Sequence, residues 1–103
     1  MSMAAPEVKN KIKPNIDLKE PSMYKVVYVN DDSTTMEFVV DSLVEHFDYT
    51  IQLAVEKTNE IHVDGAAGVA VLPYEMAEQK GIEVTLDART AGYPLQIKIE
   101  PTN

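Results

Sequence analysis

The densest group of polar side chains in this sequence is the run Asn30-Asp31-Asp32, and a histidine, His62, lies further along the chain. Carboxylates and an imidazole can ligate a divalent metal, but no second His or Glu follows at ligand spacing, so no metal site is expected. Asn and Asp at a turn also commonly accept hydrogen bonds from their own backbone. A lone histidine at a helix end is commonly a cap. The residue types alone therefore leave a structural role and a binding role open.

Signatures of catalysis are missing from the sequence. It has no Gly-rich phosphate loop, no serine nucleophile elbow and no separated pair of acids. The chain also contains no cysteine, which rules out a cysteine nucleophile, a thiolate metal cage and a disulfide framework. We therefore expect neither enzymatic activity nor a cofactor.

The polar run lies between a predicted strand and a predicted helix. Residues 24–29 are rich in β-branched and aromatic side chains, and the turn-forming residues that follow end the strand. Residues 34–37 have the form of a capping box in which the Thr34 hydroxyl accepts from the Glu37 amide, so a helix is expected to begin there. Apolar residues at steps of three and four predict a buried stripe opposite a polar face that includes Ser42. The stripe consists of Met36, Val39, Val40, Leu43, Val44 and Phe47.

A second helix is predicted to carry His62 near its end. Thr50 is a typical start residue, and Ile51, Ala54, Val55 and Thr58 follow at helical spacing. The pair Asp64-Gly65 is a stop signal. His62 should therefore lie in the last turn.

The C-terminal half predicts strand, helix and strand. Residues 68–72 form a short apolar run typical of a buried strand, and Pro73 suits the first turn of a helix. Residues 82–87 fit both a strand alternation and a helical face, while residues 95–99 alternate as a half-buried strand does. The order β-α-α-β-α-β predicts an α+β fold, with a three-stranded antiparallel sheet and helices packed on one face.

The composition limits the kinds of partner that the protein can bind and the cellular compartment that we expect for it. Nine basic against seventeen acidic residues give a formal charge of −8, which is the wrong sign for binding nucleic acid. The apolar runs are far shorter than the roughly 20 residues of a membrane helix, and no leader opens the chain. Since cysteine is also absent, a cytoplasmic protein is expected. Residues 1–22 are rich in Pro and polar residues and are expected to form a flexible N-terminal tail.

Several segments together resemble the ClpS family of adaptors for the bacterial Clp protease. The resemblance runs in order over about residues 21–100 and is carried by Pro21–Asp32, Thr34, Met36–Val39, Ile61-His62, Ala77–Lys80 and Ala88–Leu95. It implies an adaptor domain over residues 23–103, with residues 82–87 helical.

The resemblance also implies a function. ClpS proteins bind the free N-terminal Phe, Tyr, Trp or Leu of a substrate and deliver it to the unfoldase ClpA or ClpC, which works with the protease ClpP. The positions that match the α-amino site are Asn30, Asp31 and His62. Those that match the side-chain pocket are Thr34, Met36, Val39, Thr58, Ile61 and Leu95, and those that match the unfoldase-docking surface are Glu75 and Lys80. Thr58 departs from the family, which commonly has Met at this position.

Two other functions remain open at this point. A small structural interaction domain similar to the C-terminal domain of ribosomal protein L7/L12 would have the same α+β shape but would not need Asn30, Asp31 and His62. A ClpS-like protein could also modulate the unfoldase without binding N-terminal residues. Binding of a peptide with a free bulky N-terminus separates these hypotheses.

Overall fold

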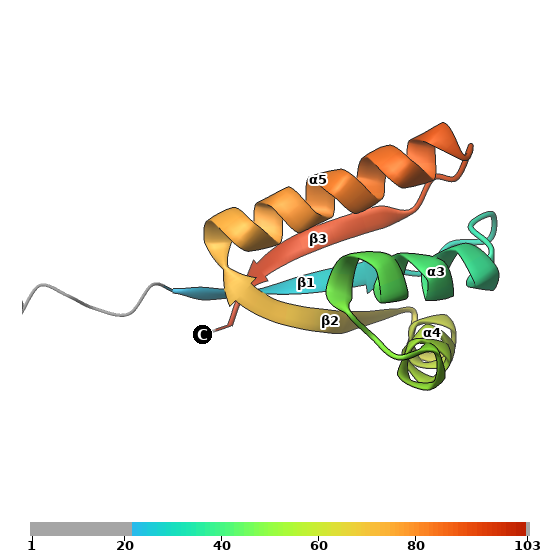
Figure 1. Cartoon of the computed structure of the whole chain (residues 1–103), viewed down its shortest axis with the longest axis horizontal. Helices are drawn as coiled ribbons and strands as arrows, with labels where there is room; N and C mark the ends of the chain where they lie inside the picture. Colours follow the sequence, from blue (N-terminus) through green and yellow to red (C-terminus); the bar gives the residue numbers. More distant parts are fainter. Residues whose placement is uncertain (1–21, 103) are drawn as a thin grey trace, which may run out of the picture.

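The computed structural model describes residues 22–102, which form a three-stranded sheet and three helices (Figure 1). The expected tail lies, apart from Ser22, outside the described residues. None of the helices in residues 22–102 is both long and apolar enough to cross a membrane. The elements, in chain order, are β1 (Met23–Val29), α3 (Met36–Phe47), α4 (Ile51–Asp64), β2 (Ala66–Pro73), α5 (Tyr74–Thr90) and β3 (Gln96–Pro101).

β1 is the central strand of the sheet, which has the order β2-β1-β3 and is antiparallel throughout. Val26 pairs with Ala70 on one side and with Ile99 on the other. The buried centre of β1 explains its composition, because a strand covered on both faces needs apolar residues at consecutive positions. The predicted order of elements and the antiparallel sheet are confirmed.

The start of α3 differs from the predicted capping box. Thr35, not Thr34, is the N-cap, and its hydroxyl accepts from the Phe38 amide at 3.1 Å. The Thr34 hydroxyl instead donates to the Asp31 carboxylate at 2.8 Å. The cap therefore lies one residue later than predicted, because the preceding carboxylate engages the Thr34 hydroxyl.

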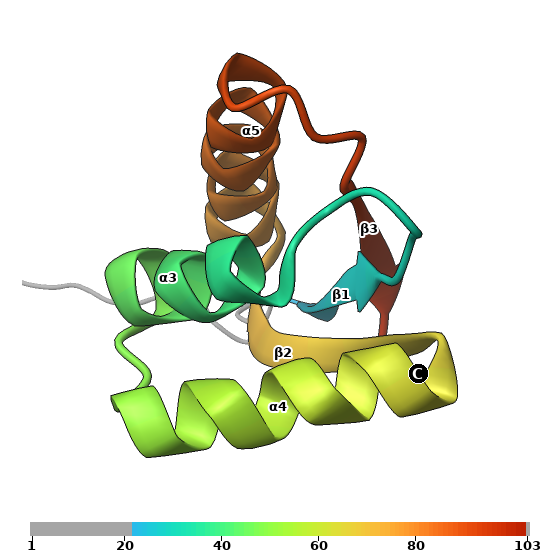
Figure 2. The same cartoon turned by 90° about the vertical axis from the view of Figure 1, so that its right-hand side faces the viewer.

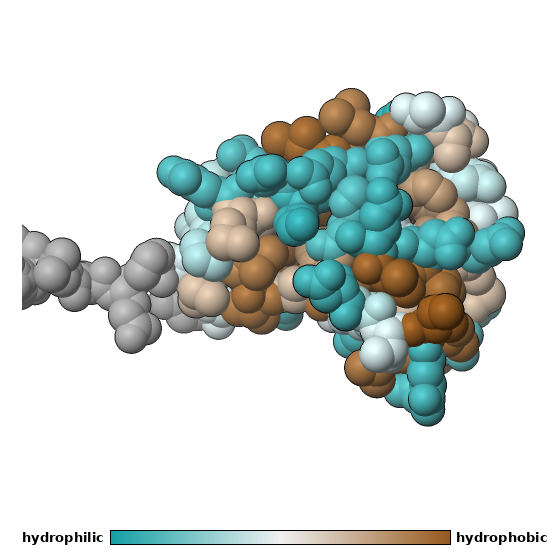
Figure 3. All heavy atoms as spheres, viewed as in Figure 1, coloured by the Kyte–Doolittle hydropathy of each residue, from teal (hydrophilic) through white to brown (hydrophobic). Residues whose placement is uncertain are grey.

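Residues 82–87, whose sequence fits both a strand and a helix, belong to the helix α5. Its buried face contains Ala77, Gly81, Val84 and Ala88, whose small size lets the helix lie close to the sheet. A Cβ added at Gly81 would lie 3.4 Å from Ile99 Cδ1, so this contact leaves little room for a larger residue. Of the apolar residues that suggested a strand, Val84 is buried, whereas Ile82 and Leu86 lie on the solvent side of α5, where Figure 3 shows apolar side chains along the upper edge.

The buried face of α3 also differs from the predicted stripe. Met36 was expected inside but is 43% exposed, whereas Ser42 was expected outside but is 4% exposed. The Ser42 hydroxyl donates to the Val39 carbonyl and lies 2.8 Å from the Tyr28 hydroxyl. Since Ser42 has one hydroxyl hydrogen, Tyr28 must be the donor in the second bond. Burial raises the pKa of the Tyr28 phenol far above its usual value, which keeps this donor protonated.

We expect Ser42→Ala to destabilise the protein more than Tyr28→Phe. Ser42→Ala leaves the buried Tyr28 hydroxyl without a partner, at a cost of about 1–3 kcal/mol. Tyr28→Phe removes one hydrogen bond but leaves Ser42 bonded to Val39, at a cost of about 1 kcal/mol or less. Urea unfolding of both variants and of the double variant measures the difference. An equal or larger loss in Tyr28→Phe would contradict this account.

Candidate functional site

Most of the predicted site residues belong to elements that meet at one end of the molecule, which Figure 2 faces. The end of β1, the start of α3, α4 and the connection from α5 to β3 all lie there. Asn30 follows β1 directly, and its backbone amide donates to the Gly65 carbonyl at 2.9 Å. Gly65 caps α4 with a left-handed φ of 87°, a conformation that glycine adopts without steric cost. This bond holds Asn30 beside the last turn of α4, which carries the exposed His62.

Asp31 is held in place by its own loop. Its carboxylate accepts from the Ser33 amide at 2.8 Å, the Thr34 amide at 2.7 Å and the Thr34 hydroxyl at 2.8 Å. Burial raises the pKa of the Asp31 carboxyl, but these hydrogen bonds and the charge of Arg89 outweigh it, so the pKa lies below its usual value. Asp31 is therefore an anion at neutral pH. A carboxylate has about four lone-pair sites, so it retains acceptor capacity beyond these three bonds.

The six predicted pocket residues differ in exposure. Four of them are buried, with exposed fractions of 6% for Val39, 3% for Thr58, 2% for Ile61 and 1% for Leu95. Val39, Ile61 and Leu95 belong to one apolar core cluster. The structure thus brings these three together, while Met36 is exposed and Thr34 is half-buried.

Thr58 is the exception among the buried pocket positions. Its hydroxyl is inaccessible to solvent and has no hydrogen-bond partner within residues 22–102. The departure from the family noted in the sequence therefore introduces a buried polar atom that no described protein group satisfies.

The last turn of α5 and its connection to β3 contribute two residues, Arg89 and Tyr93, that were not predicted as site residues. Arg89 Nη1 donates to the carbonyls of Tyr93 at 3.0 Å and Leu95 at 2.8 Å, which fixes the segment that carries Leu95. The Tyr93 ring packs edge-on against Phe38 at a centroid distance of 5.2 Å, and its hydroxyl accepts from Thr35 at 3.4 Å. These residues lie inside or beside the segments that carry the family resemblance, which was the available signal.

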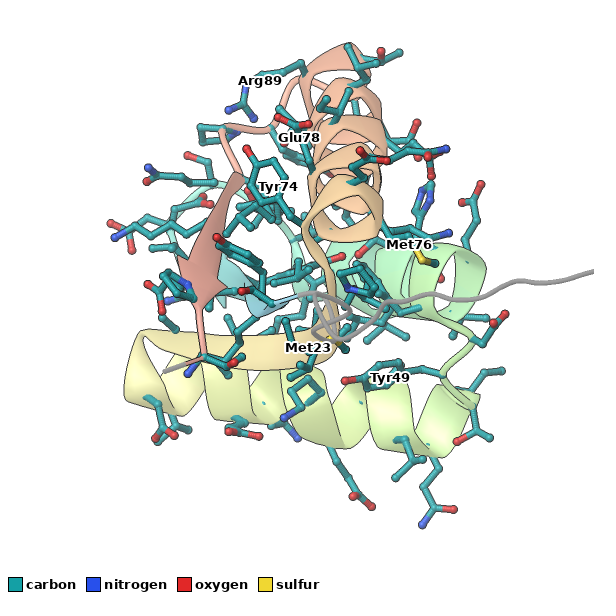
Figure 4. The ribbon with its side chains drawn as sticks, turned by 90° about the vertical axis from the view of Figure 1, so that its left-hand side faces the viewer. Met23, Tyr49, Tyr74, Met76, Glu78 and Arg89 are labelled. Carbon is teal, nitrogen blue, oxygen red and sulfur yellow. The ribbon has the colours of Figure 1, made fainter. Side chains whose placement is uncertain are left out.

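The two predicted docking residues do not share a face of α5. Glu75 is exposed in the first turn, whereas Lys80 is half-buried five positions later, about 140° around the helix. Glu75 lines a surface hollow together with Tyr74 and Met76. Figure 4 shows Tyr74, Met76 and Met23 at the end of the sheet where α5 begins, on the side of the molecule away from the view in Figure 2.

A second histidine, His46, lies in the group of described residues that could hold a metal ion. Glu45, His46 and Asp87 offer ligand atoms within 4.8 Å of one another. His46 Nε2 is 2.7 Å from Asp87 Oδ2, and Nδ1 is 3.4 Å from Glu83 Oε1. These contacts join α3 to α5 as a partly exposed hydrogen-bonded cluster and need no metal.

Comparison with known proteins identifies the family. The family model described as "ATP-dependent Clp protease adaptor protein ClpS" matches residues 19–98. ATP-dependent Clp protease adapter protein ClpS of Sodalis glossinidius is 37% identical over 95% of this chain and 87% of its own length. Its counterpart in Escherichia coli O1:K1 is 43% identical over 81% of this chain and 78% of its own length.

A solved structure agrees with this result. Agrobacterium tumefaciens ClpS2 bound to L-phenylalaninamide superposes with a TM-score of 0.77 at 35% identity, covering 80% of this chain and 99% of that one. The relatives are named as adaptors of a protease and not as enzymes. The chain therefore belongs to the ClpS family of ATP-dependent Clp protease adaptor proteins.

Proposed function

We propose that this adaptor binds proteins that carry a free, bulky hydrophobic N-terminal residue, namely Phe, Tyr, Trp or Leu, and delivers them in the cytoplasm to a Clp unfoldase. The observation that carries this proposal is the L-phenylalaninamide bound to the related Agrobacterium protein. That ligand has a free α-amino group, an aromatic side chain and an amide where the next residue would begin. It is thus the smallest mimic of a Phe-initiated chain.

The α-amino group would be bound by Asn30, Asp31 and His62. An ammonium group has three donors and a positive charge, so it needs acceptors from several directions, at least one of them anionic. Asn30 supplies an amide oxygen, Asp31 a carboxylate that is ionised at neutral pH, and His62 an imidazole nitrogen. His62 must be neutral to accept, since both nitrogens of the protonated ring are donors.

The side chain of the N-terminal residue would pass Met36 and Thr34 and contact Val39, Ile61 and Leu95. Burying a Phe or Leu side chain contributes about 1.5–3 kcal/mol. Each charge-assisted hydrogen bond to the ammonium adds about 1.5–3 kcal/mol. Association costs several kcal/mol, so the expected dissociation constants are of the order of micromolar.

Delivery would use a different surface of the protein. Glu75 and Lys80 on α5 match the family's docking positions for the unfoldase, ClpA or ClpC, which works with ClpP. Glu75 lies beside the exposed Tyr74 and Met76, so an apolar contact can accompany the charged one. Glu75 lies at the end of the fold away from the proposed substrate site, which would let one adaptor hold both partners at once.

N-acetylation of a Phe-initiated peptide should remove most of its binding, by a factor of at least about 30, because it deletes the charge and two of the three donors of the ammonium group. Fluorescence-anisotropy titration of the free and acetylated peptides measures the ratio. A Ser-initiated peptide with a free amino group controls for charge alone and should bind weakly. Equal affinity of the free and acetylated peptides would contradict the proposal and favour an unfoldase modulator that binds no N-terminal residue.

A further inference from the structure

The hydroxyl of Thr58 is buried without a partner, in contrast to the other buried polar side chain of the described chain, Ser42. Ser42 donates to the Val39 carbonyl and accepts from Tyr28. A threonine inside a helix commonly donates to the carbonyl four residues earlier, but Thr58 makes no such bond to Ala54. Buried hydroxyl groups are almost always paired, so this unpaired one calls for a partner from outside the protein chain.

The position of Thr58 on α4 matches the reach of one aromatic side chain. Thr58 and His62 are four residues apart and lie on the same side of the helix, separated by about 6 Å along its axis. His62 is exposed, and Thr58 is 3% exposed next to the buried Ile61. If the substrate's amino group lies at His62, a tyrosine side chain directed along α4 brings its phenol to the level of the Thr58 hydroxyl.

We propose that Thr58 makes this site selective for tyrosine over phenylalanine and leucine, by pairing its buried hydroxyl with the phenol of an N-terminal Tyr. This inference rests on the proposed function. A phenol and a threonine hydroxyl can each donate and accept, so a Tyr substrate satisfies both groups. Phe and Leu leave the Thr58 hydroxyl unpaired, and a site with a buried polar group discriminates against ligands that cannot bond it.

The expected preference for a Tyr-initiated peptide over its Phe twin is about tenfold, the effect of one well-made neutral hydrogen bond in a buried site. The ring would enter past Met36, an unbranched and partly exposed side chain. Phe and Leu peptides still gain the apolar contacts with Val39, Ile61 and Leu95, so they bind more weakly but measurably.

The test is an anisotropy titration of Tyr-, Phe- and Leu-initiated peptides that are otherwise identical. Thr58→Val keeps the shape and removes the hydroxyl, so the Tyr preference should disappear while Phe affinity is kept or improved. Thr58→Ser keeps a hydroxyl and should retain the preference. Thr85→Val, on the distant helix α5, is the matched control and should leave the ranking unchanged. Thermal melts should give a higher midpoint for Thr58→Val, since the unpaired hydroxyl is gone.

The outcomes separate this inference from the proposed function. If the wild type binds none of the three peptides, the proposed function fails and the inference fails with it. If it binds Tyr and Phe peptides equally, the proposed function stands and the role of Thr58 is overturned. A Tyr preference that survives in Thr58→Val also overturns it, because another group must then recognise the phenol.

Discussion

Replacing Asp31 by Asn is expected to weaken binding of a Phe-initiated peptide by at least about 30-fold, equivalent to about 2 kcal/mol. The substitution leaves a substrate ammonium without its anionic partner. Asn keeps an oxygen that can accept from the Ser33 and Thr34 amides, so the loop is preserved better than in Asp31→Ala. Asp31→Ala should lose at least as much affinity and also some stability, because those two amides lose their acceptor.

Asp32→Asn is the matched control for this prediction. Asp32 is the neighbouring carboxylate and is exposed, so the variant has the same net charge as Asp31→Asn. Its affinity for the peptide should stay within about twofold of the wild type, because an exposed carboxylate interacts weakly in water. If both variants lose affinity alike, the general negative charge of the protein, and not Asp31, attracts the peptide.

Testing Asp31→Asn with the N-acetylated peptide isolates the contact between the Asp31 carboxylate and the substrate's amino group. In a double-mutant cycle, Asp31→Asn should have little further effect on binding of the N-acetylated peptide, since its ammonium is already absent. Additive losses would mean that Asp31 acts by shaping the loop and not by pairing with the amino group.

Met36→Ala should create binding to Ile- and Val-initiated peptides while preserving much of the affinity for Leu. Met36 is the first residue of α3 and is 43% exposed. A long thioether at the opening can occupy the space beside a substrate's β-carbon, which admits side chains that branch further out and clashes with β-branched ones. Removing the obstruction should cost specificity before affinity.

The exposure of Met36 also predicts the stability of this variant. A core methionine truncated to alanine costs about 2–5 kcal/mol, whereas a side chain that is nearly half exposed should cost much less. Met76→Ala, at a similarly exposed methionine on α5, is the matched control and should leave peptide selectivity unchanged. Titration against Leu, Ile and Val peptides with parallel thermal melts tests both points. A uniform loss of affinity with a lowered melting midpoint would reject Met36 as a gate.

Local signals explain which parts of the fold were predictable. Thr50 caps α4 by accepting from the Leu53 amide, and Gly65 ends the helix in a left-handed conformation, as their types suggested. Both interactions join residues within one turn, so neighbours in the chain carry the whole signal. The alternation of Ile97 and Ile99 in β3 was readable for the same reason, because one face of that strand is half-buried against the core.

The hydrophobic pattern of the sequence was insufficient where packing between distant segments determines the structure. Residues 82–87 fit two periods, and the helix prevails because Gly81 lets α5 lie against Ile99 of β3. Ser42 is buried because Tyr28, on a distant strand, provides a donor for its hydroxyl. A hydrophobicity pattern does not reveal that a distant residue such as Tyr28 will form a hydrogen bond with Ser42.

The sequence by itself determined the fold class, the family resemblance and the chemical types of the candidate site residues, since these depend on local patterns and residue identity. Only the tertiary structure decided how those residues are arranged. It joined Asn30 to the end of α4 through the Gly65 carbonyl. It also left the Thr58 hydroxyl buried without a partner. Each of these features depends on which groups folding brings within hydrogen-bond distance, and chain position alone does not specify that for distant residues.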